Sequence, residues 1–259
     1  MFIPLVIATV CRIIPPSEPE FHGVALNEWL DRSYDFCTGE DEVPRYGEAA
    51  TAVRGIGTNA IPIILQMMNE RDSRLRSFIA NHAPKRLHFN DADYDRMAGA
   101  YGFIALGAQS KPAVPALIKL ADDPDPEMRY GAVVALGYLD CAPEQIVPAL
   151  VKHLDDTRVL GEAAEGLGRL GQEPRIAIPA LIRHIGHSPT GSDNSYYVAW
   201  ALACFGSQAK PAIPALLKRL QEDQDEHDSN PSLQQIIKEA ITAIDPESAS
   251  QEFKDSESN

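Results

Sequence analysis

Apolar residues along this chain recur in segments with the spacing of an α-helix. The segments end in two large apolar residues three positions apart, as in Leu136/Leu139 and Leu202/Phe205. The corresponding pairs elsewhere are Val53/Ile56, Phe103/Leu106 and Leu167/Leu170. Because residues three apart share one face of a helix, each pair predicts a helix with a buried side. No segment alternates apolar and polar residues over the length of a strand, so the pattern predicts an all-α fold.

A second kind of segment follows each pair and carries a proline near its start. These prolines are Pro62, Pro115, Pro148, Pro179 and Pro214, and the last four are each followed by Ala-Leu. Proline is tolerated in the first turn of a helix and is unfavourable further inside, so each proline is predicted to open a helix. A turn residue precedes each proline: Gly57, Gly107, Asp140, Gly171 and Gly206. Glycine is favoured just past a helix end, so each unit is predicted to be a helical hairpin.

The hairpins repeat with a period in the thirties. The intervals from Pro115 to Pro148, Pro179 and Pro214 are successively 33, 31 and 35 residues, whereas the interval before Pro115 is 53. A hairpin of this size cannot bury its own apolar face, so the core must come from stacking of neighbours. Small residues such as Ala163 and Gly166 around the apolar pairs would let these helices approach closely.

The repeated phrases also resemble those of a known family. Asp123-Pro-Asp-Pro-Glu-Met-Arg129 resembles the start of the first helix of a HEAT-like repeat of the PBS-lyase type, and Pro115-Ala-Leu-Ile-Lys119 resembles the second helix. The resemblance covers roughly residues 48–244 and implies an α-α superhelix, a HEAT-like solenoid of about five helical hairpins. It also implies that Asp123 and Arg129 tie adjacent repeats together. The segment Phe21–Leu30 is more loosely similar to uncharacterised bacterial HEAT-repeat proteins.

Three regions are expected along the chain. Residues 1–20 form an apolar segment and a linker, which we interpret as the remnant of a signal or anchor, because a membrane span needs about 20 apolar residues. Residues 21–245 form the solenoid, with an insertion near 70–91, and residues 246–259 form a disordered acidic tail. The apolar start favours the cell envelope, anchored or exported, over the cytoplasm, with the segment as a membrane tether. We expect a monomer.

Charge and motifs exclude several function classes. The formal net charge of −14 argues against a nucleic-acid partner, which requires a basic surface, and so against a DNA-base-excision HEAT protein. The four cysteines lack the spacing of a zinc or redox site, and the GxGxxG spelling at 166–171 falls at a helix end inside a repeat. The sequence therefore predicts no catalytic residue, no cofactor and no metal site.

A set of basic residues recurs in phase with the prolines. Four residues after each of the last four prolines stand Lys119, Lys152, Arg183 and Lys218, and next to three of them stand His153, His184 and Arg219. One interpretation is that these side chains line a groove that binds an anionic partner. The other is that cations suit the later part of a helix, where the helix dipole favours them.

The long interval before Pro115 contains the second candidate site. Its surplus carries basic and aromatic residues, namely Arg74, Arg76, Phe78, Lys85 and Arg86. Insertions in repeat proteins often lie on the binding face, and arginine and aromatic residues anchor interfaces. The alternative is an extra helix near 73–81 that packs beside the first repeat.

These observations predict a non-catalytic scaffold that presents a curved repeat surface to a protein or peptide partner. The resemblance leaves one alternative of another class: a HEAT-like lyase or chaperone acting on a bilin chromophore protein. That alternative requires a pocket of converging polar groups.

Overall fold

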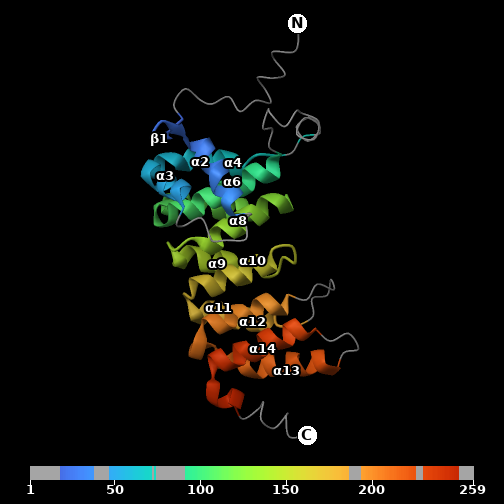
Figure 1. Cartoon of the computed structure of the whole chain (residues 1–259). Helices are drawn as coiled ribbons and strands as arrows, with labels where there is room; N and C mark the ends of the chain where they lie inside the picture. Colours follow the sequence, from blue (N-terminus) through green and yellow to red (C-terminus); the bar gives the residue numbers. More distant parts are fainter. Residues whose placement is uncertain are drawn as a thin grey trace. The chain divides into compact units, whose positions relative to one another are not determined.

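The computed structural model describes residues 18–37, 47–71, 73, 91–186, 194–225 and 230–250, which are almost entirely helical (Figure 1). The described strands are β1 (Glu20–Phe21) and β2 (Val24–Ala25), which form an antiparallel hairpin that the sequence pattern did not predict. The chain divides into two compact units, Met1–Ala135 and Leu136–Asn259, with the boundary inside α8 (Pro126–Tyr138). Each unit is described by itself.

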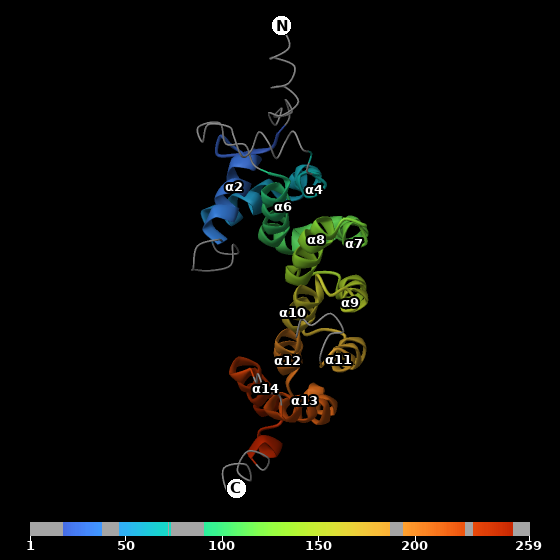
Figure 2. The same cartoon turned by 90° about the vertical axis from the view of Figure 1, so that its right-hand side faces the viewer.

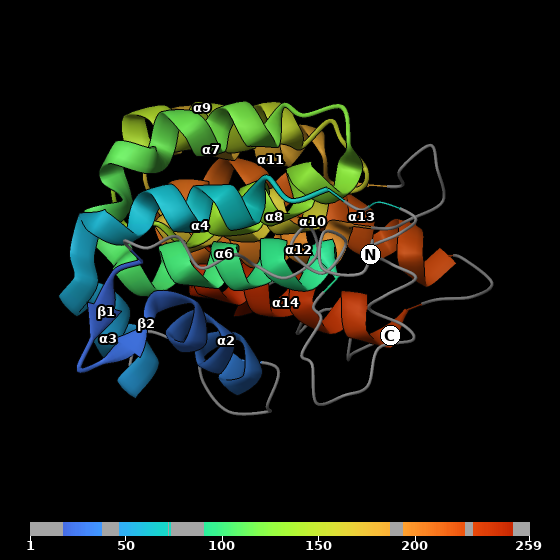
Figure 3. The ribbon, with the colours of Figure 1, turned by 90° about the horizontal axis from the view of Figure 1, so that it is seen from above.

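Unit 1 is built around a long central helix. It contains α2 (Leu26–Cys37), α3 (Glu48–Ile56), α4 (Ile61–Met68), α6 (Ala92–Leu106) and α7 (Val114–Ala121). α6 lies between α4 and α2 in the view from above (Figure 3). The Glu18 carboxylate accepts a hydrogen bond from the Asn27 N–H at 2.7 Å, which satisfies a free donor at the start of α2. Leu26, Trp29 and Leu30 are buried, so α2 covers the apolar end of the unit.

Unit 2 consists of two layers of helices. The first-helix layer contains α10 (Leu160–Leu170), α12 (Ser195–Cys204) and α14 (Pro231–Ile244), and the second-helix layer contains α9 (Pro143–His153), α11 (Pro174–Arg183) and α13 (Ile213–Asp225). The two layers stand on opposite sides of the unit in Figure 2. In chain order, the pairs of a first and a second helix within the described residues are α3–α4, α6–α7, α8–α9, α10–α11 and α12–α13. The predicted number of about five is confirmed.

The predicted packing of apolar and small residues is confirmed. Eight of the ten residues of the predicted pairs are buried, whereas Ile56 and Leu170 are half-buried. In unit 2, consecutive first helices approach so closely that a Cβ atom built on Gly166 would lie 2.6 Å from the Gly137 Cα atom. A Cβ atom on Gly168 would lie 2.8 Å from the Ala201 Cα atom. Only glycine fits at these contacts, which explains the small residues around the apolar pairs.

We call the five recurring prolines, Pro62, Pro115, Pro148, Pro179 and Pro214, the marker prolines. The prediction that each of them opens a helix is correct for three and wrong for two. Pro62, Pro115 and Pro214 occupy the first turns of α4, α7 and α13. Pro148 and Pro179 instead lie inside α9 and α11, which begin at Pro143 and Pro174, five residues earlier.

The difference follows from a second proline. Pro143 and Pro174 stand five residues before the marker prolines Pro148 and Pro179, and each opens the α-helix itself. Proline is suited to this position because its missing N–H is not needed in the first turn. In the other two repeats the second proline stands three residues before the marker, as Pro112 and Pro211, and lies inside the 3-10 helices η4 (Gly107–Ala113) and η5 (Gly206–Ala212). The α-helix there begins only after these segments.

The glycine turns behave as predicted, and the aspartate turn does not. Gly57, Gly107, Gly171 and Gly206 all have positive φ angles between 54° and 69°, a conformation that glycine adopts without strain. In the repeat with Asp140, the positive φ of 50° falls on Ala142, directly before the helix-opening Pro143. Glu173 has the same φ before Pro174.

The tie between Asp123 and Arg129 runs through the backbone. The Arg129 Nη1 atom donates to the carbonyl oxygens of Asp123 and Pro124, each at 3.0 Å. The Asp123 carboxylate instead accepts from the Asp125 N–H and from Arg71 at 2.7 Å. The hydrogen bond from the Asp125 N–H, followed by the bond from Arg71, lowers the pKa of Asp123 even though burial acts in the opposite direction.

A related tie occurs in the preceding repeat, where the sequence reasoning missed it. The Arg96 guanidinium is buried, donates to the Glu70 carbonyl at 2.7 Å and pairs with Asp93. Arg96 and Arg129 each stand seven residues before the first member of an apolar pair, Phe103 or Leu136. That common position could have predicted that Arg96 makes the same kind of tie as Arg129.

The ends of the chain require one correction. Residues 246–250, predicted to begin a disordered tail, are helical, and Ala249 is buried. The Asp245 carboxylate precedes this turn and binds the Lys210 ammonium at 3.0 Å, and that hydrogen bond lowers the pKa of Asp245. Residues 251–259 and the apolar segment 1–17 lie outside the described residues. None of the helices in the described ranges has the length and apolar character needed to cross a membrane.

Candidate functional site

The four basic residues that follow the marker prolines at a fixed distance are all exposed. Lys152, Arg183 and Lys218 project from α9, α11 and α13, the three members of the second-helix layer of unit 2. Lys119 occupies the same place on α7 in unit 1. We call Lys152, Arg183 and Lys218 the basic ladder of unit 2.

The residues next to the ladder do not share its exposure. His153 and Arg219 are buried, with 5% and 2% of their surfaces exposed, and His184 is half-buried. The prediction that they line the same surface is therefore wrong for His153 and Arg219. Consecutive residues in a helix are about 100° apart around its axis, so the residue after an exposed cation turns toward the core. The sequence contained the signal, because the residue at this position in the first of these repeats is Leu120.

Arg219 has a structural environment. Its Nη2 atom lies 3.8 Å from the Asp223 Oδ1 atom, and both side chains are 2% exposed. Asp223 also accepts from the Asn230 N–H and, at 2.9 Å, from the Gln234 side chain at the start of α14. These bonds attach the end of α13 to α14, so Asp223 is not one of the solvated acidic loop residues that its sequence position suggests.

His184 also connects neighbouring repeats. Its Nε2 atom lies 2.9 Å from the Asp155 Oδ1 atom in the turn after α9, and its Nδ1 atom lies 2.8 Å from the Ala180 carbonyl oxygen. Both ring nitrogens are therefore engaged within the protein.

Lys218 and Arg183 differ in the ion pairs that they make with the described residues. Lys218 pairs with Glu222 at 3.4 Å, and both side chains are well exposed, at 78% and 46%. An exposed pair of this kind contributes about 0–1 kcal/mol, so solvent or a ligand replaces it easily. Arg183 makes no ion pair with any residue in the described ranges, and the same holds for Lys119.

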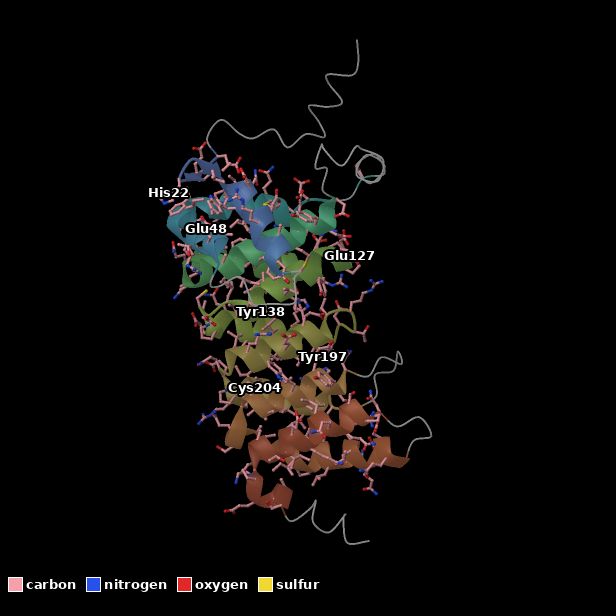
Figure 4. All side chains as sticks on the ribbon, viewed as in Figure 1. His22, Glu48, Glu127, Tyr138, Tyr197 and Cys204 are labelled. Carbon is pink, nitrogen blue, oxygen red and sulfur yellow. The ribbon has the colours of Figure 1, made fainter. Side chains whose placement is uncertain are left out.

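The first-helix layer of unit 2 carries a different cluster. The Arg169 guanidinium lies 4.2 Å from the centre of the Tyr138 ring and 5.8 Å from that of Trp200. The Glu165 carboxylate accepts from Arg169 at 2.6 and 3.0 Å. Tyr138 and Cys204 are labelled on this side of the unit in Figure 4. Burial raises the pKa of the Cys204 thiol, and the nearby charge of Arg169 acts against this rise. Arg169 is occupied within the cluster, which joins three consecutive first helices.

The predicted binding residues of the insertion lie outside the described residues; they are Arg74, Arg76, Phe78, Lys85 and Arg86. The same holds for the helix expected near 73–81, of which only Ser73 is described. The ends of the insertion are described. The Glu70 carbonyl accepts from Arg96, Arg71 pairs with Asp123 at 2.7 Å, and the Asp91 side chain caps α6 by accepting from the Tyr94 N–H. Both ends are therefore held by hydrogen bonds within unit 1.

No group of three histidine, cysteine or acidic side chains in the described parts of the chain is arranged to hold a metal ion. No observation on those residues supports the bilin alternative.

The class of protein follows from this architecture: consecutive helical hairpins with buried apolar pairs form a helical-repeat solenoid. Residues 114–193, about a third of the chain, match the protein-family model for HEAT repeats.

A solved structure supports the helical-repeat fold. The crystal structure of Kap121p is similar with a TM-score of 0.52 and 18% identity, over 84% of this chain and 25% of that chain. This chain thus spans a quarter of the length of Kap121p. Two engineered proteins studied by the Northeast Structural Genomics Consortium also match, with 21% and 19% identity and TM-scores of 0.42 and 0.46. These alignments cover 85% and 84% of this chain and 97% and 98% of theirs. No curated protein matches.

Proposed function

We propose that this protein is a non-catalytic scaffold that binds an acidic protein or peptide segment on the second-helix layer of unit 2. The observation that carries the proposal is the basic ladder: one exposed cation at the same position on each of α9, α11 and α13. The ladder stands out because the chain as a whole has a net charge of −14. A cation that recurs at one exposed position on an acidic protein favours a local anionic ligand.

The packing of the solenoid does not account for Arg183. Its guanidinium has no ion-pair partner within the described residues, unlike Arg219, Arg129 and Arg96, which bind groups of the protein. An unused, exposed arginine costs the fold little and is suited to bidentate recognition of a carboxylate.

Binding of a labelled peptide tests this proposal. The probe is a fluorescein-labelled oligoglutamate of twelve residues, with oligoglutamine as the uncharged control, and the readout is fluorescence anisotropy. Arg183→Glu is expected to weaken binding about tenfold or more, which corresponds to ~1.4 kcal/mol. Affinity should also fall as salt is raised, because the contacts are between exposed charges.

The matched control is Arg175→Glu, which makes the same change of charge on the same helix. Arg175 is exposed in the first turn of α11, two helical turns before Arg183. Equal weakening of peptide binding by both substitutions would show that binding depends on net charge and not on the ladder position. An unchanged affinity of the Arg183→Glu protein would contradict the proposal.

A further inference from the structure

We infer that the preferred ligand of the basic ladder is an extended segment in polyproline II conformation with an acidic residue at every third position. The inference rests on the proposed function and goes beyond it by defining the spacing and shape of the partner.

The first step is the spacing of the cations. Lys152, Arg183 and Lys218 each stand four residues after a marker proline, so they occupy equivalent places on their helices. α11 packs against α9 and against η5, the segment that leads into α13. Packed helices lie about 8–10 Å apart, so Lys152 on α9 and Arg183 on α11 should be separated by about this distance.

The second step compares this spacing with regular peptide conformations. A polyproline II helix has three residues per turn and a rise of 3.1 Å, so residues i and i+3 lie on one face about 9 Å apart. Alternate residues of a strand share a face at about 7 Å, which does not match one cation per helix. The polyproline II repeat therefore matches the ladder directly.

The third step excludes a helical ligand. Residues i and i+7 of an α-helix are also about 10 Å apart, but helical ligands usually bind by laying an apolar face into an apolar groove. Among the described residues, the exposed large apolar side chains are Ile176, Tyr196 and Tyr197, and only Ile176 belongs to the second-helix layer. Within the described residues of that layer, one exposed large apolar side chain does not form the groove that the apolar face of a helix requires.

The fourth step concerns what lies beside the cations. The marker prolines Pro148, Pro179 and Pro214 are exposed, and each stands one helical turn before its cation on the same face. The layer thus presents a row of proline rings beside a row of cations. A polyproline II segment has three faces, so one can carry carboxylates toward the cations while the next places small apolar residues on the prolines.

Two peptides of identical composition test the spacing. One is (Asp-Pro-Pro) repeated four times, and the other contains the same four aspartates together in the centre, flanked by four prolines on each side. Both are labelled with fluorescein and titrated with the full-length protein. The periodic peptide is expected to bind about tenfold more tightly than the clustered one, and Arg183→Glu should remove this difference while Arg175→Glu retains it.

The outcomes separate the two proposals. Equal affinity for both peptides, with both weakened by Arg183→Glu, would overturn the spacing inference and leave the proposed function standing. Tighter binding of the clustered peptide would also overturn the spacing. Failure of both peptides and of oligoglutamate to bind would overturn the inference together with the proposed function.

Discussion

The two helix layers of unit 2 repeat different residues for different reasons. In the first-helix layer, Gly137 meets Gly166 and Gly168 meets Ala201 at distances that leave no room for a side chain. In the second-helix layer, the repeated residue is an exposed cation. The comparison teaches that recurrence alone does not reveal a role. Where the repeated residue is buried against a neighbour, the fold requires it. Where it is exposed, as with Arg183, which has no ion-pair partner among the described residues, we propose that it binds a ligand.

The largest expected effect on stability tests whether the buried Arg219 and the exposed Lys218, both on α13, differ in what they contribute to the fold. Asp223→Ala leaves the buried Arg219 without its carboxylate and should lower the free energy of unfolding by about 3–5 kcal/mol. Urea denaturation followed by circular dichroism measures this change. The adjacent Glu222→Ala, which removes only the exposed pair with Lys218, should cost no more than about 1 kcal/mol. Similar losses for the two variants would contradict the distinction between buried and exposed cations.

The next effect tests the glycine contacts of the first-helix layer. Gly137→Ala places a Cβ atom 2.8 Å from the Gly166 Cα atom and should destabilise the protein by about 1–3 kcal/mol. Gly131→Ala in the same helix is the control, because the nearest atom is 3.7 Å away and alanine favours the helix by up to about 1 kcal/mol. Thermal unfolding of both variants measures the contrast. A Gly137→Ala protein as stable as Gly131→Ala would disprove the close contact.

A smaller effect concerns the start of α11 in the second-helix layer. Glu173 has a φ angle of 50°, which is unfavourable for a residue with a side chain. Glu173→Gly should therefore stabilise the protein by up to about 1 kcal/mol. The neighbouring Gln172→Gly should not stabilise it, since the structure has no positive φ angle there. A loss of stability with Glu173→Gly, measured in urea, would contradict the strained start of the helix.

The smallest effect on stability belongs to the ladder itself. Arg183→Glu should change the free energy of unfolding by no more than about 0.5 kcal/mol, because the side chain is exposed and has no ion-pair partner among the described residues. Differential scanning calorimetry should give nearly the same melting temperature as for the original protein. A large drop in the melting temperature would show that Arg183 stabilises the fold. The repeated residues of both layers would then have a structural role.

The sequence predicted the hairpins and their number because apolar pairs and glycine turns recur in phase, and these features depend on local chemistry. It misplaced the starts of α9 and α11 because Pro143 and Pro174 can open a helix as readily as Pro148 and Pro179 can. It predicted the ladder but not the burial of His153 and Arg219, since a charged residue in a helix is ordinarily exposed. Only the equivalent Leu120 indicated the inward direction. The Arg169 cluster depends on contacts between repeats, which the sequence does not specify.

Zero-length cross-linking with a carbodiimide tests the central claim most directly, because it joins a peptide carboxylate to a lysine amine only where the two are in contact. After reaction with the periodic aspartate–proline peptide, mass spectrometry should find the cross-links of unit 2 at Lys152 and Lys218. Lys210, which pairs with Asp245 within the protein, and Lys238 lie outside the ladder in the same unit and should carry no peptide. Cross-links at Lys210 or Lys238 as abundant as those at Lys152 and Lys218 would contradict the assignment of binding to the basic ladder.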